Sequence, residues 1–98
     1  MANDRKTQLT SNFAGARKRF LSISHPAAYA ALVKSGQLES HLARIGEEAA
    51  DHYLTLEDQL KQQASQIAEE RERQAYLSQI PHMAKEMVLS EIVEIAPE

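Results

Sequence analysis

The sequence predicts an all-α protein, a small bundle of four or five helices with a long central helix. Apolar residues recur at steps of three and four along most of the 98 residues, as on one face of a helix. No stretch shows the strict alternation of a half-buried strand. At this length we expect one helical domain over residues 1–98, with residues 1–8 disordered.

The first helix is predicted over residues 10–22. Gly15 should weaken it by about 1 kcal/mol relative to alanine, so packing must hold it. Its apolar stripe is spaced four, three, four and three residues apart: Leu9, Phe13, Ala16, Phe20 and Ile23.

A short apolar helix is predicted over residues 26–35. Pro26 suits its first turn, after a cap from Ser24 or His25, and Gly36 suits a left-handed end. The run AAYAALV is apolar on all sides. Such a helix is expected to be buried or docked.

The central helix begins near Gln37, and its spacing allows two endings. It either continues to about residue 78, as an antiparallel coiled-coil-like arm of roughly 60 Å, or breaks near Ser65 and starts again. Pro81 is then predicted to start the last helix, since Ile80 before it favours extended geometry.

Charge is distributed unevenly along the chain, whose net charge is -3. Residues 1–34 hold six basic residues and one acidic residue, and residues 35–98 hold five basic and thirteen acidic residues. The asymmetry indicates either a basic surface for nucleic acid or two halves that attract each other within the fold or across a dimer. The second interpretation is favoured.

No motif for chemistry is present, so the sequence predicts a non-enzymatic protein without a cofactor. Cysteine is absent, which excludes thiolate chemistry. Only three glycines occur, and they form neither a P-loop nor a G-x-S-x-G elbow. No apolar run reaches the roughly 18 residues of a membrane span, and no signal peptide is evident. We therefore expect a cytoplasmic protein without a membrane partner.

One histidine group resembles a metal site only loosely. His41, Glu48 and His52 share a side of the central helix, but they do not form the H-E-x-x-H pattern and no further ligand is evident. We predict solvated side chains and no metal.

Two charged sets are the candidate contact residues. A basic set could bind nucleic acid or an acidic partner, and an acidic set could bind a basic partner. The basic set is Arg17, Lys18 and Arg19. The acidic set is Glu47, Glu48, Asp51, Glu57 and Asp58.

A string of fold-building residues carries a family resemblance. It comprises Arg19, Phe20, Leu21, His25, Pro26, Tyr29, Leu32, Val33, Gly36, Leu38, Leu42, Ile45, Glu47 and Ala49, then Ala84, Glu86, Met87, Val88, Glu91 and Ile92. The pattern resembles the TnpV family of transposon-encoded proteins over about residues 17–95. The chain looks like a distant, shorter relative, because the family's N-terminal portion and an aromatic residue near residues 79–82 are missing.

The resemblance implies an accessory protein of a mobile genetic element or phage. We expect it to act by binding a macromolecule, with a host or element-encoded protein favoured over nucleic acid. One alternative is an anti-defence inhibitor of a host nuclease complex, of the anti-CRISPR type. Another is a DNA-binding regulator or excision factor that uses the basic first helix. A homodimer is also compatible with the sequence.

Overall fold

The computed structural model describes residues 2–97, and the described chain is helical without a strand. This confirms the predicted all-α bundle. The elements are α1 (Ala2–Ser24), α2 (Pro26–Ser35), α3 (Leu38–Ala64), α4 (Glu70–Val88) and the π-helix η1 (Leu89–Val93).

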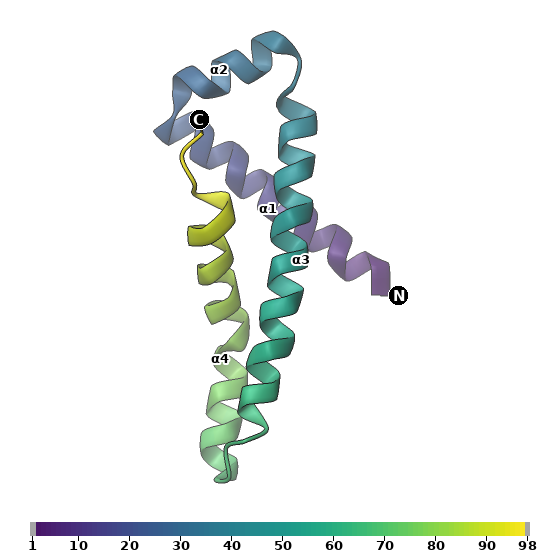
Figure 1. The fold of residues 1–98 in the computed structure, drawn as a ribbon, viewed down its shortest axis with the longest axis vertical. Helices are drawn as coiled ribbons and strands as arrows, with labels where there is room; N and C mark the ends of the chain where they lie inside the picture. Colours follow the sequence, from purple (N-terminus) through teal and green to yellow (C-terminus); the bar gives the residue numbers. More distant parts are fainter. Residues whose placement is uncertain (1, 98) are drawn as a thin grey trace.

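The helices form an elongated molecule of 55 × 29 × 16 Å. Figure 1 shows α3 and α4 side by side and antiparallel, with α1 crossing behind them. Helix α2 runs across one end and joins the end of α1 to the start of α3. The C-terminal segment ends close to the junction of α1 and α2.

Helix α1 begins earlier than predicted, because residues 2–8 are helical rather than disordered. Met1 lies outside the described residues. Two cations of this segment reach the acidic side of α3: Arg5 pairs with Glu57, and Lys6 pairs with Asp51 at 2.9 Å. These long-range ion pairs anchor a segment whose composition alone predicts no structure.

Helix α2 has the predicted bounds but not the predicted burial. Gly36 adopts the left-handed conformation with φ 75°, and the N–H of Gln37 bonds to the carbonyl of Leu32 at 3.0 Å. No side-chain bond from His25 caps its start. None of its residues is buried, so the first of the two expectations, that this helix is buried or docked, is wrong. Ala28, Tyr29 and Leu32 are half-buried, as in a helix docked on its neighbours.

The long helical region breaks near Ser65, which decides between the two predicted endings. Helix α4 then begins at Glu70, where the carboxylate of Glu69 accepts hydrogen bonds from the backbone N–H groups of Arg71 and Glu72. Pro81 lies inside α4, so the prediction that it starts a helix is wrong. The buried side chains on either side of it, Ile80 and Ala84, hold the helix through the proline.

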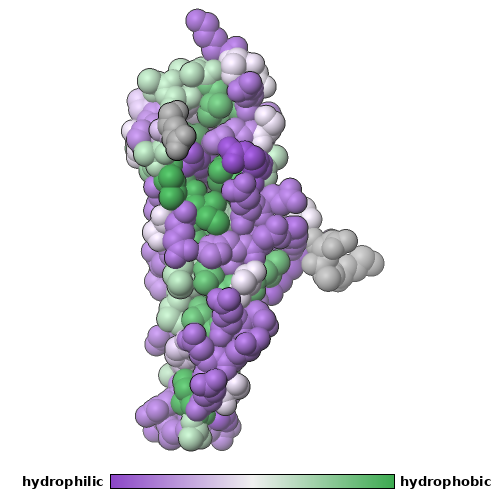
Figure 2. Space-filling model, viewed as in Figure 1, coloured by the Kyte–Doolittle hydropathy of each residue, from purple (hydrophilic) through white to green (hydrophobic). Residues whose placement is uncertain are grey.

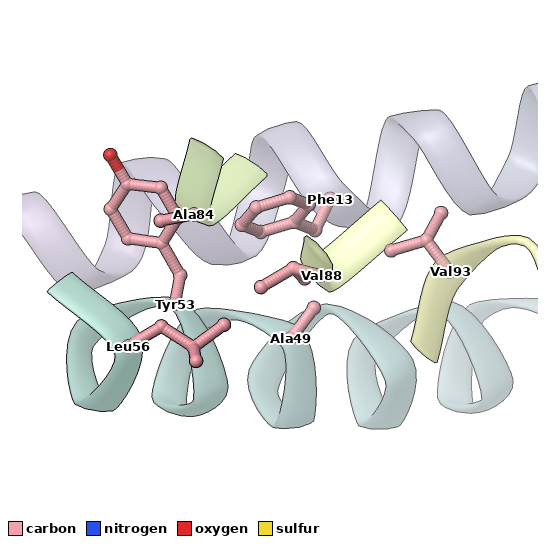
Figure 3. Packing of buried hydrophobic residues seen from close by; sticks show 7 residues of the cluster. All are labelled: Phe13, Ala49, Tyr53, Leu56, Ala84, Val88 and Val93. Atoms are coloured by element: carbon pink, nitrogen blue, oxygen red, sulfur yellow. The ribbon is translucent and has the colours of Figure 1, made fainter. Parts of the chain in front are cut away.

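The core fills the space where α1 meets the α3–α4 pair. Figure 3 shows the Phe13 ring pointing from α1 into this space, and its centroid lies 6.0 Å from that of Tyr53. The cluster consists of Phe13, Ala49, Tyr53, Leu56, Ala84, Val88 and Val93. All three long helices therefore contribute to one core.

Gly46 sets how closely α1 approaches α3. A Cβ atom at this position would lie 2.5 Å from the backbone oxygen of Thr10 and 3.1 Å from the Cβ of Ala14. The two backbones can pack at this distance only because position 46 has no side chain.

Candidate functional site

The predicted basic set does not form one surface. Arg17 is 3% exposed, whereas Lys18 and Arg19 are exposed. The Nη1 atom of Arg17 donates to the carbonyl oxygens of Val93 and Ile95 at 2.8 and 2.5 Å. A contact role for this set stays a prediction, and only Lys18 and Arg19 are free to fulfil it in this conformation.

Arg17 also belongs to a small cationic cluster. Its Nε donates to Nε2 of His41 at 3.2 Å, and Nη2 of Arg44 lies 3.3 Å from Nδ1 of the same ring. Burial lowers the pKa of His41, and the charges of Arg17 and Arg44 lower it further. The histidine is therefore held neutral between two arginines.

The basic start of α1 is neutralised by the acidic side of α3. Glu57 is buried and pairs with Arg5 and, at 3.7 Å, with Lys61. The hydrogen bond from Arg5 lowers the pKa of Glu57, and this outweighs the effect of burial. These pairs support the interpretation that the two charged halves attract each other within the fold.

The other predicted acidic contact residues also have partners within the chain. Lys6 lies 3.8 Å from Glu47 and 2.9 Å from Asp51, Arg44 lies 3.6 Å from Glu48, and Asp58 accepts a bond from Gln62 at 3.1 Å. Binding of a basic partner by this set stays a prediction. Such a partner would have to compete with these internal cations.

The three residues of the loose metal pattern are engaged separately. His41 lies in the arginine cluster, Glu48 pairs with Arg44, and His52 bonds to Glu91 at 2.6 Å. Over residues 2–97 no group of three or more side chains has the arrangement needed to hold a metal ion.

Exposed apolar side chains lie on α2 and at the end of α1. Val33 on α2 is 52% exposed and Ile23 at the end of α1 is 72% exposed. Figure 2 shows the apolar colouring over α2 at the end of the molecule. A contiguous exposed apolar patch is typical of an interaction site, whereas single exposed apolar residues are common on protein surfaces.

A groove that Ile23 also lines runs along α1 and α4. It has a volume of about 890 Å³, and its walls include Phe13, Phe20 and Ile23 of α1 and Leu89 of η1. The stripe was visible in the sequence, but periodicity alone predicts burial and does not show that only part of it is covered.

The described residues form a small all-α scaffold in which the cations at the start of α1 pair with carboxylates of α3 and some apolar side chains are exposed. The chain belongs to the TnpV family of transposon-encoded proteins, whose profile matches residues 1–93. The match confirms the resemblance and includes the N-terminal residues that the resemblance left out. No significantly similar curated protein or solved structure is found. None of the helices described over residues 2–97 is long and apolar enough to cross a membrane.

Proposed function

We propose that this chain is a non-enzymatic accessory protein of a mobile genetic element that acts in the cytoplasm by binding a protein. Membership of a transposon-encoded family supports the setting. The observation that carries protein binding is α2, whose AAYAALV run is apolar although none of its residues is buried. Leaving apolar area in water costs about 25 cal/mol per Å², so burying the apolar side chains of α2 against a partner would stabilise the complex.

A protein partner has more support than DNA. Within the basic set, Arg17 donates hydrogen bonds to backbone carbonyls. The cations at the start of α1 pair with carboxylates of α3. Lys18 and Arg19 remain, which is a small number for phosphate binding. The partner is encoded by the host or by the element.

Affinity purification with matched variants tests the proposal. The tagged chain is expressed in cells that carry its transposon, alongside Val33→Asp on α2 and Gln74→Asp at an exposed position of α4. We expect a partner that co-purifies with the wild type and Gln74→Asp and is lost with Val33→Asp. Circular dichroism and melting establish that both variants fold. Recovery that is equal for all three proteins would contradict a role for α2.

A gel-shift experiment tests the DNA alternative on the same protein. The probes are the ends of the transposon, and the control is the double variant Lys18→Ala/Arg19→Ala. Binding that weakens with salt and disappears in the double variant would replace the proposed function with DNA binding. We expect no such binding.

A further inference from the structure

The groove between α1 and α4 has a floor with the spacing of a helix–helix seam. The steps of four, three, four and three from Leu9 to Ile23 are the a and d spacing of a heptad repeat. Such a stripe packs against another helix by inserting its side chains between those of the partner.

Only the first part of this seam is covered by the chain itself. Phe13 is 4% exposed and lies in the core, whereas Phe20 is half-buried and Ile23 is 72% exposed. Helix α1 already meets α3 through a different face, which includes Thr10 and Ala14 opposite Gly46. Ala16 packs against the edge of the core and the Phe20 ring lies 5.2 Å from the His25 ring, so within residues 2–97 the C-terminal half of the seam is only partly covered.

Two cations and one carboxylate lie among the described residues that line the groove. Arg19, His82 and Lys85 line it, and among the described residues none of these three side chains forms an ion pair or a hydrogen bond. Glu94 is the one carboxylate among the described lining residues. A ligand with carboxylates beside an apolar stripe would complement this surface.

We infer that the groove binds an amphipathic α-helix of a partner protein, whose apolar stripe is flanked by Asp and Glu. The partner's apolar residues lie on Ala16, Phe20 and Ile23, and its carboxylates face Arg19 and Lys85. This inference rests on the proposed function and names the chemistry of the partner. Two copies of this chain would instead bring two cation-lined grooves together, which charge repulsion opposes.

Two synthetic peptides test the inference. Both are about three heptads long with Leu at a and d, and they differ only in carrying Glu or Lys at e and g. Fluorescence anisotropy gives Kd for each peptide with the full chain. We expect the Glu peptide to bind at least about tenfold more tightly than the Lys peptide.

Matched variants place the peptide in the groove. Ile23→Asp should weaken binding of the Glu peptide by at least about tenfold. Val33→Asp, also an exposed apolar position but outside the groove lining, should leave it unchanged. The double variant Arg19→Glu/Lys85→Glu should reverse the preference toward the Lys peptide. Because all these positions are exposed, melting temperatures should stay near that of the wild type.

Several results would overturn the inference. They are equal affinity for both peptides, no saturation by either, or binding that Ile23→Asp leaves intact. Light scattering that shows a dimer, split by Ile23→Asp, would assign the groove to a second copy. Partner capture that depends on Val33 while neither peptide binds would end this inference and leave the proposed function standing. Peptide binding without any partner in cells would do the reverse.

Discussion

Arg17 on α1 donates a hydrogen bond of 2.8 Å to the carbonyl oxygen of Val93, which lies 76 positions later at the end of η1. Carbonyls at a helix C-terminus lack partners within the helix and carry partial negative charge. The buried guanidinium satisfies them, and the Phe20 ring centroid lies 5.5 Å from its central carbon. The contact ties the first helix to the C-terminal segment.

Replacing Arg17 should therefore destabilise the fold, not only a contact surface. Arg17→Met keeps an apolar stem of similar length but removes every donor. We expect a loss of about 2–3 kcal/mol in the free energy of unfolding, measured by urea denaturation. Arg19→Met, at an exposed neighbour, should change it by less than about 0.5 kcal/mol. Equal effects of the two substitutions would show that the Arg17 bonds do not stabilise the protein.

The two helical glycines should respond in opposite directions to alanine. Gly46→Ala adds a methyl group 2.5 Å from the backbone oxygen of Thr10, so α1 must move from α3, at a cost of about 1–3 kcal/mol. Gly15→Ala meets no atom within 4 Å and should stabilise α1 by up to about 1 kcal/mol. Urea denaturation of both variants measures the difference. Similar stability of the two would contradict the close packing of α1 on α3.

Stability should fall as the pH drops toward 5.5 because His41 is held neutral. The pKa of His41 lies below its ordinary 6.5 in the folded chain, through burial and the charges of Arg17 and Arg44. As the pH falls below about 6.5, the unfolded chain binds a proton that the folded chain does not, so the folded state loses stability. His41→Gln should flatten this dependence, whereas His82→Gln on α4 should not. A slope that persists in His41→Gln would assign the effect to other groups.

The Arg5–Glu57 pair should stabilise the N-terminal half of α1 at pH values where the Glu57 carboxylate is ionised. The pKa of Glu57 lies below its ordinary 4.5, chiefly through the hydrogen bond from Arg5. The stabilisation is present above pH 4.5 and is lost as the pH falls through the lowered pKa. Arg5→Gln should cost about 1–2 kcal/mol at pH 7, and the deficit should shrink near pH 3. Arg71→Gln, which removes a cation without an ion-pair partner among residues 2–97, serves as the control, and a deficit independent of pH would contradict the pair.

Local signals predicted the parts of the fold that depend on neighbouring residues. Helix α2 begins at Pro26 and ends before Gly36 as expected, since a proline in the first turn and a left-handed residue at the end act on the backbone within a few positions. The break near Ser65 was one of two predicted endings for the same reason. Pro81 was misplaced because the Glu69 carboxylate caps α4 twelve residues before the proline, and packing then outweighs the effect of the proline.

The long-range contacts of the candidate site could not be predicted from local sequence signals. Arg17 flanks the apolar stripe of α1, and its burial depends on carbonyls at Val93 and Ile95, which no local pattern connects to it. The helical start of α1 depends in the same way on Glu57 and Asp51 of α3. The groove could not be predicted from the apolar periodicity of α1, because an apolar stripe predicts burial whether it packs against this chain or against a partner.

Photocrosslinking from position 23 tests most directly the claim that this chain binds a protein partner through the groove. A benzophenone amino acid replaces Ile23 in the groove or Gln74 on the exposed part of α4, in cells carrying the transposon. We expect a protein adduct from position 23 only, and the crosslinked segment of the partner should carry an apolar helical stripe flanked by carboxylates. Adducts to DNA, or no adduct from position 23 beyond that from position 74, would contradict it.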